Sequence, residues 1–340
     1  MVDLLEYHNV GAWLQHCRRP LLVTHRRPDG DALGALVAAA LALRTRGLDP
    51  RPTLFEAFPP RYALLRDLVP WHRWPDERAA LEANCDALVI VDTCASAQLE
   101  PIAAYLPHAP RTLVIDHHPT PDPLATRPGD LRLLDETAGA ACLVLTELVR
   151  ALDVPLDPPL ATALFIGLAT DSGWFHYSNT DARVLRAATE LAGAGAVPNA
   201  IYRAIYEQDS PARLRLTART LQSLRLLADD RLAVMTLRQA DFAAAGADST
   251  MTEDLVNEAS HLGCIEATIL FTEEPDGRVR VNFRSKSPLD VRKSALDVAA
   301  LARRFGGGGH ARAAGARPPG SCDDVIARVT AATVAALGQP

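Results

Sequence analysis

Residues 111–118, RTLVIDHH, consist of a short apolar run that ends in an aspartate and two histidines. The run has the length and the β-branched content of a buried strand. Two similar runs precede it in the chain, PLLVTH at 20–25 and DALVIVDT at 86–93. We therefore predict three strands that are apolar throughout, each followed directly by polar residues.

Longer apolar segments with helical spacing separate or follow these strands. ALGALVAAALALRTRG (32–47) closes on a glycine, TAGAACLVLTELVRAL covers 137–152, and PPLATALFIGLATDSGWF (158–175) predicts a helix that ends near Asp171. Apolar strands alternating with helices are typical of a parallel sheet that is covered on both faces. The predicted fold class is α/β with a mainly parallel sheet.

Polar residues occur where these strands end. His25, Asp92 and Asp116 each follow or close an apolar run. In open α/β sheets, ligands bind outside the carboxyl ends of the strands. We expect the three loops to meet at one crevice, with His117 and His118 reaching into it.

The segment HRRPDGDALG (25–34) adds Asp29 and Asp31 to His25, around a tight turn. Asp31 could instead be an ordinary helix cap, and Asp92 could cap a helix in the same way. Asp171 ends an apolar segment, where an unpaired carboxylate would cost several kcal/mol. Taken together, these residues favour a shared site over independent structural roles.

The candidate ligands are carboxylates and imidazoles, and none is a thiolate. This donor set suits Mn²⁺ or a similar ion better than a cysteine-bound zinc. The carboxylates are too many for one tetrahedral site. Two ions about 3.5–4 Å apart, sharing a bridging aspartate, would use them all and could promote attack on phosphorus.

Composition indicates a soluble globular protein of two domains. The chain has 340 residues, 48 % hydrophobic and 22 % charged, with a formal charge of −6. The negative charge argues against binding long nucleic acid over the whole surface. The six cysteines form no C-x-x-C pair, and no signal pattern or run of about 20 apolar residues occurs, so we expect a cytoplasmic protein.

The second half of the chain predicts a smaller α/β domain. Strand signals occur at 231–237, 264–273 and 278–285, and the last two are joined by a turn at Asp276-Gly277. The expected organisation is a catalytic domain over 1–205, a connecting segment over 206–229 with a helix at 210–230, and a substrate-binding domain over 230–340.

The stretch 278–317 is strongly basic. It holds ten Lys or Arg and two acids, a local charge of +8 in an acidic chain. A solvated basic face would explain this equally well. Within the stretch, GGGGH (306–310) could let backbone N–H groups approach an anion closely. Arg284 and His310 are the best candidates for binding a terminal phosphate.

The motifs HRRPDGDALG, VDT (91–93), IDHH (115–118) and ATDSGWF (169–175) resemble the four motifs of the DHH phosphoesterase superfamily. VNFRSK (281–286) and FGGGGHARAAGA (305–316) resemble its DHHA1 domain. The resemblance implies one metal ion on His25, Asp29 and Asp92. A second ion would lie on Asp31, Asp92, His117 and Asp171.

The resemblance also assigns roles to the remaining residues. Asp92 would bridge the ions, His118 would face the phosphate, and Asp116 would orient a histidine; these are the implied catalytic residues. The substrate would lie in the cleft between the domains. The implied substrate-binding residues are Arg284, Ser285, Gly307, Gly308, Gly309 and His310.

The compact two-domain form is most similar to the nanoRNase/pAp-phosphatase group, which degrades short oligoribonucleotides and 3′-phosphoadenosine 5′-phosphate (pAp) with Mn²⁺. Mg²⁺ and Co²⁺ are alternative cofactors. Hydrolysis of cyclic di-AMP or pApA is the main alternative activity, and a RecJ-like single-strand DNA exonuclease or a non-catalytic nucleotide-binding module is less favoured. The oligomeric state stays open, with a homodimer as one form. No membrane partner is expected.

Overall fold

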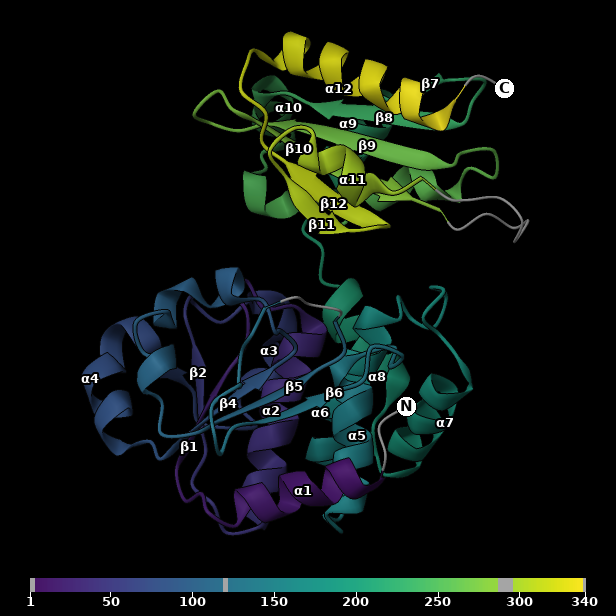
Figure 1. The fold of residues 1–340 in the computed structure, drawn as a ribbon. Coiled ribbons are helices and arrows are strands. Elements are labelled where there is room, and N and C mark those ends of the chain that lie inside the picture. Colours follow the sequence, from purple (N-terminus) through teal and green to yellow (C-terminus); the bar gives the residue numbers. More distant parts are fainter. Residues whose placement is uncertain (1–3, 119–121, 287–295, 339–340) are drawn as a thin grey trace. The chain divides into compact units, whose positions relative to one another are not determined.

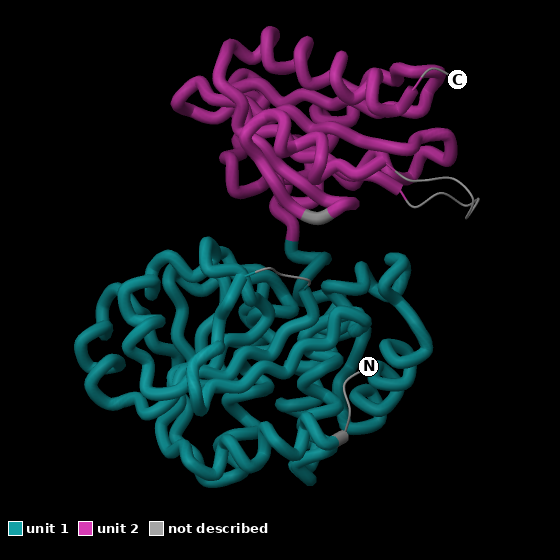
Figure 2. The backbone as a smooth tube through the Cα atoms, viewed as in Figure 1, with its two compact units in different colours: residues 1–208 teal, residues 209–340 magenta. Residues whose placement is uncertain are grey.

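The computed structural model describes residues 4–118, 122–286 and 296–338. The chain divides into two compact units, Met1–Gln208 and Asp209–Pro340 (Figure 2). Each unit is built around one six-stranded sheet with its own helices (Figure 1). This division places helix α9, Pro211–Gln222, in the second unit, whereas the sequence predicts a connecting segment over 206–229.

The sheet of the first unit is parallel throughout, as predicted. Its order is β3-β2-β1-β4-β5-β6, and each neighbouring pair is parallel. The strands are β1 Pro20–Val23, β2 Arg51–Leu54, β3 His72–Arg73, β4 Ala87–Val91, β5 Thr112–Asp116 and β6 Leu131–Leu134. The three predicted strands are β1, β4 and β5, which lie side by side within this sheet.

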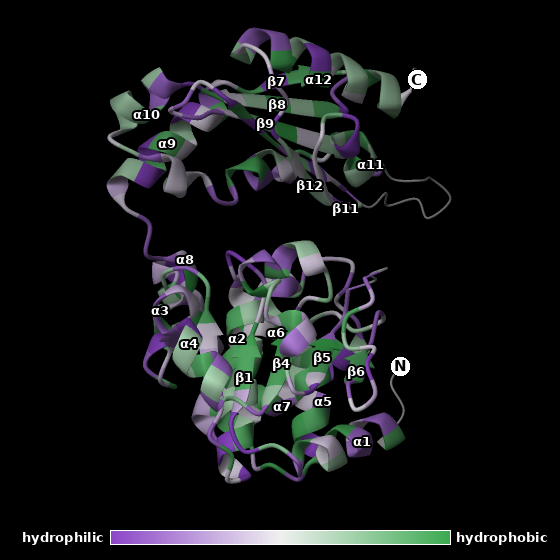
Figure 3. Cartoon of the chain, turned by 60° about the vertical axis from the view of Figure 1, so that its left-hand side comes forward, coloured by the Kyte–Doolittle hydropathy of each residue, from purple (hydrophilic) through white to green (hydrophobic). Residues whose placement is uncertain are grey.

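The helices of the first unit cover both faces of its sheet. Alternate residues of β1 and β4 enter two cores: Leu22 and Val89 pack with α1, α2, α5 and α6, whereas Leu21 and Leu88 pack with α4 and η2. Figure 3 shows the hydrophobic colour concentrated on β1, β4, β5 and α2. The helices are α1 Leu4–Leu14, α2 Gly30–Thr45, α3 Ala63–Arg66, α4 Trp74–Asn84, α5 Ala141–Ala151, α6 Pro158–Asp171, α7 Ala182–Gly193 and α8 Pro198–Tyr206, with 3₁₀ turns η1 Pro60–Tyr62, η2 Ser96–Ile102 and η3 Leu106–His108.

The strand order of this sheet reverses between β1 and β4. The chain runs outward from β1 to β2 and β3, then returns to place β4 on the other side of β1. A crevice opens at such a reversal, outside the carboxyl ends of the strands, and α/β proteins bind ligands there. His25 follows β1 and Asp92 follows β4, so the two residues flank this point.

The second unit has a mixed sheet of order β11-β12-β10-β9-β8-β7, in which only the β8–β9 pair is parallel. The strands are β7 Arg225–Leu227, β8 Leu232–Leu237, β9 Ala267–Glu273, β10 Val279–Ser285, β11 Gly308–His310 and β12 Ala313–Ala316. The β9–β10 hairpin turns at Asp276-Gly277, as predicted, and Gly277 has the positive φ of 79° that such turns require.

Helices cover both faces of the second sheet, one face over only part of its width. Helices α11 and α12 pack on one face against Val281 and Phe283, and α9, α10 and η5 pack on the other against Leu270. The elements are α9 Pro211–Gln222, α10 Gln239–Ala245, α11 Val298–Arg303, α12 Cys322–Leu337, η4 Ser249–Thr252 and η5 Leu255–His261.

Two predicted helices differ from the structure, and one strand was not predicted. The helix expected at 137–152 begins only at Ala141, because residues 135–140 form a turn around the carboxylate of Asp135. The helix expected at 210–230 ends at Gln222, and β7 follows it. The GGGGH tract, for which no strand was predicted, forms β11 from Gly308 onward and pairs with β12.

No helix in the described ranges is both long and apolar enough to cross a membrane. The cysteines are all free.

Candidate metal centre

Eight predicted site residues of the first unit come from the ends of five elements. His25 follows β1 and Asp92 follows β4. Asp116 is the last residue of β5, and Asp171 is the last residue of α6. The others are Asp29 and Asp31 at the start of α2, and His117 and His118 directly after β5. Strand and helix ends therefore bring together residues that are up to 146 positions apart in the sequence.

Asp92 lies at the middle of this cluster. Its side chain is buried, and its two carboxylate oxygens serve different neighbours: Oδ2 lies 3.6 Å from Nε2 of His25, and Oδ1 lies 3.6 Å from Nε2 of His117. The residue has a left-handed φ of 57°, held by a hydrogen bond from its N–H to the Ile115 carbonyl. A non-glycine residue in this conformation is uncommon and is often found at functional sites.

The ligand atoms form groups that share residues. The nitrogen and oxygen atoms of His25, Asp29 and Asp92 all lie within 4.8 Å of one another, as do those of Asp31, His117 and Asp171. Asp92 belongs to the first group, where it lies beside His25, and it lies beside His117 of the second group. These two groups with Asp92 between them are the arrangement that the family resemblance implies for two ions, although the role of each ligand stays a prediction.

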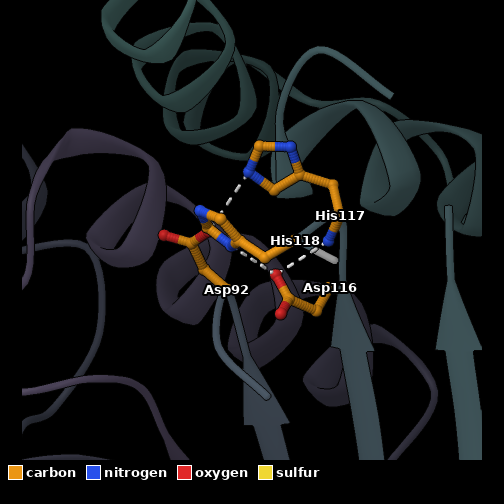
Figure 4. Close-up of side chains that lie close together, drawn as sticks. All are labelled: Asp92, Asp116, His117 and His118. Carbon is orange, nitrogen blue, oxygen red and sulfur yellow. Dashed lines mark hydrogen bonds and ion pairs between the residues drawn. The ribbon is translucent and has the colours of Figure 1, made fainter. Parts of the chain in front are cut away.

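Asp116, His117 and His118 form a third group with Asp92 at the strand ends (Figure 4). The Asp116 Oδ1 atom is fully buried and accepts from the backbone N–H of His117 at 2.7 Å and from Nδ1 of His118 at 2.9 Å. His117 instead directs its Nδ1 at the Ala138 carbonyl, 3.1 Å away. The sequence Asp116-His117-His118 thus has a structural reason. Asp116 accepts hydrogen bonds from the backbone of His117 and the side chain of His118, and the two imidazoles contact different neighbours.

The centre concentrates negative charge that the histidines partly balance. Burial lowers the pKa of His25 and His117, but the carboxylates around them, above all Asp92, outweigh it and raise the pKa to about 9 for His25 and about 10 for His117. Burial would raise the pKa of Asp92, but the two histidines hold it at about 2. Burial and the charge of Asp92 raise the pKa of Asp171 to about 7.

The residues present fit divalent cations. Oδ1 of Asp92 and Nε2 of His117 are buried and have no hydrogen-bond partner among the described residues, although both are strong hydrogen-bonding groups. Such orphaned atoms are costly unless something else satisfies them. A cation between carboxylate oxygens and imidazole nitrogens would satisfy both, and the donor set is the one that Mn²⁺ and related ions accept.

One segment without predicted ligands, residues 135–142, supports three of the proposed ligands. The backbone N–H groups of Ala141 and Cys142, at the start of α5, donate to the two oxygens of Asp31 at 2.6 and 3.0 Å. The Ala138 carbonyl accepts from His117. The Gly139 carbonyl accepts from Nδ2 of Asn179 at 2.9 Å.

Asn179 extends this support to Asp171. Its Nδ2 also lies 3.1 Å from the Asp171 carbonyl and 3.4 Å from Oδ2 of Asp171. Asn179 lies in none of the predicted site motifs, because a single asparagine in a polar loop carries no signal of its contacts. Asn179 therefore ties Asp171 to the segment that also holds Asp31 and His117.

Arg183 fixes the start of the segment. Its guanidinium donates to Oδ2 of the buried Asp135 at 2.8 Å, to Oγ1 of Thr137 at 3.2 Å and to both oxygens of Glu147. The Asp135 carboxylate accepts from the N–H and hydroxyl of Thr137. Although burial would raise it, these contacts lower the pKa of Asp135 to about 2. The turn that presents the Ala138 carbonyl is therefore held by a buried ion pair.

Replacing Asn179 by alanine should weaken one metal site only. We expect the affinity of the site on Asp31, His117 and Asp171 for Mn²⁺ to fall about 10–100-fold, the usual effect of losing a residue that orients a ligand. The site on His25 and Asp29 should keep its affinity. Calorimetric titration with Mn²⁺ would resolve the two sites.

The matched control is Asn199→Ala, which removes the same amide from an exposed position in the first turn of α8. It should leave both affinities unchanged. If Asn179→Ala weakened both sites equally, or weakened neither, Asn179 would not orient Asp171 for metal binding.

The predicted substrate-binding residues belong to the second unit. Arg284 and Ser285 end β10, Gly307 precedes β11, and Gly308 to His310 form it. The Arg284 Nε donates to Oδ1 of Asn257 at 3.1 Å. The Ser285 hydroxyl donates to the Leu296 carbonyl at 2.7 Å. Residues 287–295 of the basic stretch lie outside the described residues.

Two families of known proteins match this chain, one in each of its halves. The DHH family, N-terminal domain, matches residues 20–168, and the DHHA1 domain matches residues 229–335. A protein of Thermus thermophilus named bifunctional oligoribonuclease and PAP phosphatase NrnA is 29 % identical over 297 residues, which cover 87 % of this chain and 82 % of that protein. The Bacillus subtilis protein of the same name is 28 % identical over 300 residues, covering 87 % and 88 %.

A solved structure supports the fold of the whole chain. An exopolyphosphatase-related protein from Bacteroides fragilis superimposes with a TM-score of 0.89 at 19 % identity, covering 98 % of this chain and 97 % of that one. This likeness concerns the fold alone.

Proposed function

The chain is a DHH/DHHA1 hydrolase, and we propose that it is a metal-dependent phosphoesterase that hydrolyses short oligoribonucleotides and pAp. The observation that carries this proposal is the pair of ligand groups joined through Asp92 at the reversal of the strand order. The names of the relatives at 29 % and 28 % identity support the choice of substrate.

Two Mn²⁺ ions bound by these groups would supply Lewis-acid stabilisation of the charge that develops on the phosphoryl oxygens. His25, Asp29 and Asp92 would hold one ion. Asp31, Asp92, His117 and Asp171 would hold the other. Because these carboxylates are buried, the ions would act in a region of low dielectric constant. There they would stabilise charge on the phosphoryl oxygens more strongly than in water.

His118 is proposed to contact the substrate phosphate. Its Nδ1 is bound to Asp116, so its Nε2 would donate to a phosphate oxygen. Burial lowers the pKa of His118, but the hydrogen bond to Asp116 outweighs it and raises the pKa. A hydrogen bond from Nε2–H to an anionic phosphate oxygen would be stronger than one to a neutral acceptor.

A substrate panel tests the proposal. Purified protein with Mn²⁺ is given pAp, pApA, cyclic di-AMP, and RNA and DNA of two to about twenty nucleotides, and kcat/KM is measured for each. We expect pAp and RNA of a few nucleotides to be the best substrates. Preference for cyclic di-AMP or pApA would favour the alternative activity, and absence of turnover of every compound would contradict the proposal.

RNA length should have a strong effect on the rate. The chain carries a net charge of −6, so most of its surface should repel long strands. We expect kcat/KM to be highest at about two to five nucleotides and to fall beyond that. A rate that rises steadily up to twenty nucleotides would instead support a RecJ-like exonuclease.

A further inference from the structure

The turn between β1 and α2 holds an arginine in an unusual backbone conformation. Arg27 has a left-handed φ of 54°, a region that long side chains seldom adopt. It also precedes Pro28, and the residue before a proline normally has an extended backbone with negative φ. Among the ten non-glycine residues with positive φ in the described part of the chain, Arg27 is the only cationic one.

The proposed ligands on either side explain why the backbone turns here. His25 lies two positions before Arg27 and Asp29 two positions after it, and the ligand atoms of both lie within 4.8 Å of that of Asp92. The reversal at Arg27 brings the two residues into one group. Glycine or asparagine would make such a turn with less strain. The ligand group therefore accounts for the backbone conformation, but not for the arginine side chain.

The Arg27 guanidinium is available for a further partner. It is exposed, and it makes no hydrogen bond or ion pair within the described ranges of the chain. The neighbouring Arg26 differs, because its guanidinium lies 3.6 Å from Glu56 and 3.5 Å from Glu100. Arg27 thus keeps its N–H donors unused beside a centre that is rich in carboxylates.

Arg27 is close enough to act at the metal centre. Consecutive Cα atoms are about 3.8 Å apart, so the Cα of Arg27 lies at most about 7.6 Å from those of His25 and Asp29. A long arginine side chain can cover this distance. The divalent ions proposed for the centre would balance the charge of its carboxylate ligands, so an anionic substrate would gain from a further cation nearby.

We propose that Arg27 binds the reacting phosphate of phosphomonoester substrates such as pAp and favours them over diesters. The planar guanidinium can donate a bidentate pair of hydrogen bonds to phosphate oxygens. A phosphomonoester has one more non-bridging oxygen than a diester and, near neutral pH, about one more negative charge. It therefore gains more from an added cation. The inference rests on the proposed function, because it concerns the choice between the two substrate classes proposed there.

The test compares a monoester with a diester in the full-length protein with Mn²⁺. We measure kcat/KM for pAp and for ApA, a dinucleotide without a terminal phosphate, in the wild type and in Arg27→Asn. Asparagine accepts the left-handed conformation and removes the charge. We expect kcat/KM to fall about tenfold or more for pAp, as the loss of a charge-assisted hydrogen bond implies, and at most about threefold for ApA. Calorimetry should show inorganic phosphate binding about tenfold more weakly.

Two further variants separate the charge of Arg27 from its strain. Arg26→Asn removes the same charge one position earlier, where acids already pair with it, and should leave both rates unchanged. Arg27→Lys keeps the charge but not the bidentate geometry, and should retain part of the preference for pAp. The melting temperature of Arg27→Asn should not fall, since asparagine relieves the backbone strain.

Three results would overturn the proposal. The first is an equal loss for pAp and ApA in Arg27→Asn, and the second is the same selective loss in Arg26→Asn. The third is a marked fall in the melting temperature of Arg27→Asn, which would show that Arg27 supports the fold.

The two proposals can fail separately. If the wild type hydrolyses neither pAp nor ApA but Arg27→Asn weakens phosphate binding, Arg27 is a phosphate ligand and the proposed function fails. If the wild type hydrolyses both compounds and Arg27→Asn changes neither their ratio nor the phosphate affinity, the role of Arg27 is rejected and the phosphoesterase remains.

Discussion

Asp92→Asn should reduce kcat for pAp or a dinucleotide by about 10³-fold or more, while the protein stays folded. The side chain lies between both ligand groups, 3.6 Å from His25 and from His117. Losing its charge would remove the shared ligand, and metal stabilisation of a transition state is worth several kcal/mol, each 1.36 kcal/mol being tenfold in rate. The rate is measured at saturating Mn²⁺.

The fold should survive this change for a local reason. Asparagine tolerates the left-handed conformation that Asp92 adopts, and the backbone hydrogen bond to Ile115 does not involve the side chain. Asp86→Asn is the matched control, since Asp86 directly precedes β4 and receives hydrogen bonds from the N–H groups of Arg18 and Arg19. It should keep the wild-type rate. A wild-type rate in Asp92→Asn would refute the two-ion assignment.

Arg284→Ala should raise the KM for pAp or a dinucleotide about tenfold or more. Arg284 belongs to the second unit, whereas the proposed metal ligands all belong to the first. We propose that it binds a part of the nucleotide that does not react. A charge-assisted hydrogen bond is worth about 1.5–3 kcal/mol, which sets the size of the effect. A smaller loss of kcat can accompany it, since binding energy also orients the reacting phosphate.

The comparison substrate is bis-p-nitrophenyl phosphate, a generic ester that lacks the nucleotide. Its hydrolysis should change little in Arg284→Ala. Arg304→Ala is the matched variant, because it removes the same charge from an exposed position of the same basic stretch. It should leave both substrates unaffected. Equal slowing of the ester and the nucleotide by Arg284→Ala would show that Arg284 acts on the chemical step or on the fold.

The strands that carry the centre could be predicted because an uninterrupted apolar run indicates a strand that is buried on both faces. Runs such as LVIV at 88–91 are buried on both faces, and only a central strand of a covered sheet has that property. Strand ends of a parallel sheet meet at one edge, so His25, Asp92 and Asp116 could be placed together without any coordinates. The specific motifs then extended the prediction to Asp171, which a helix contributes.

The supports of the centre could not be predicted, because they act through backbone groups. Ala138, Gly139 and Ala141 contribute carbonyl or N–H groups, and any residue type offers these. The turn around Asp135 displaced the expected start of a helix, since an apolar run does not show where the first hydrogen-bonded turn begins. The strand in the GGGGH tract could not be predicted either, since glycine has no strand preference, yet two of its glycines allow close pairing of β11 with β12.

The most direct test of the central claim is the hydrolysis of pAp by metal-stripped protein as Mn²⁺ is added in known equivalents. We predict no turnover without metal, little with one equivalent, and full activity only when the second site fills. The same titration in Asp92→Asn should give no active state. Full activity at one equivalent, or no turnover at any Mn²⁺ concentration, would contradict a two-ion phosphoesterase centre built on Asp92.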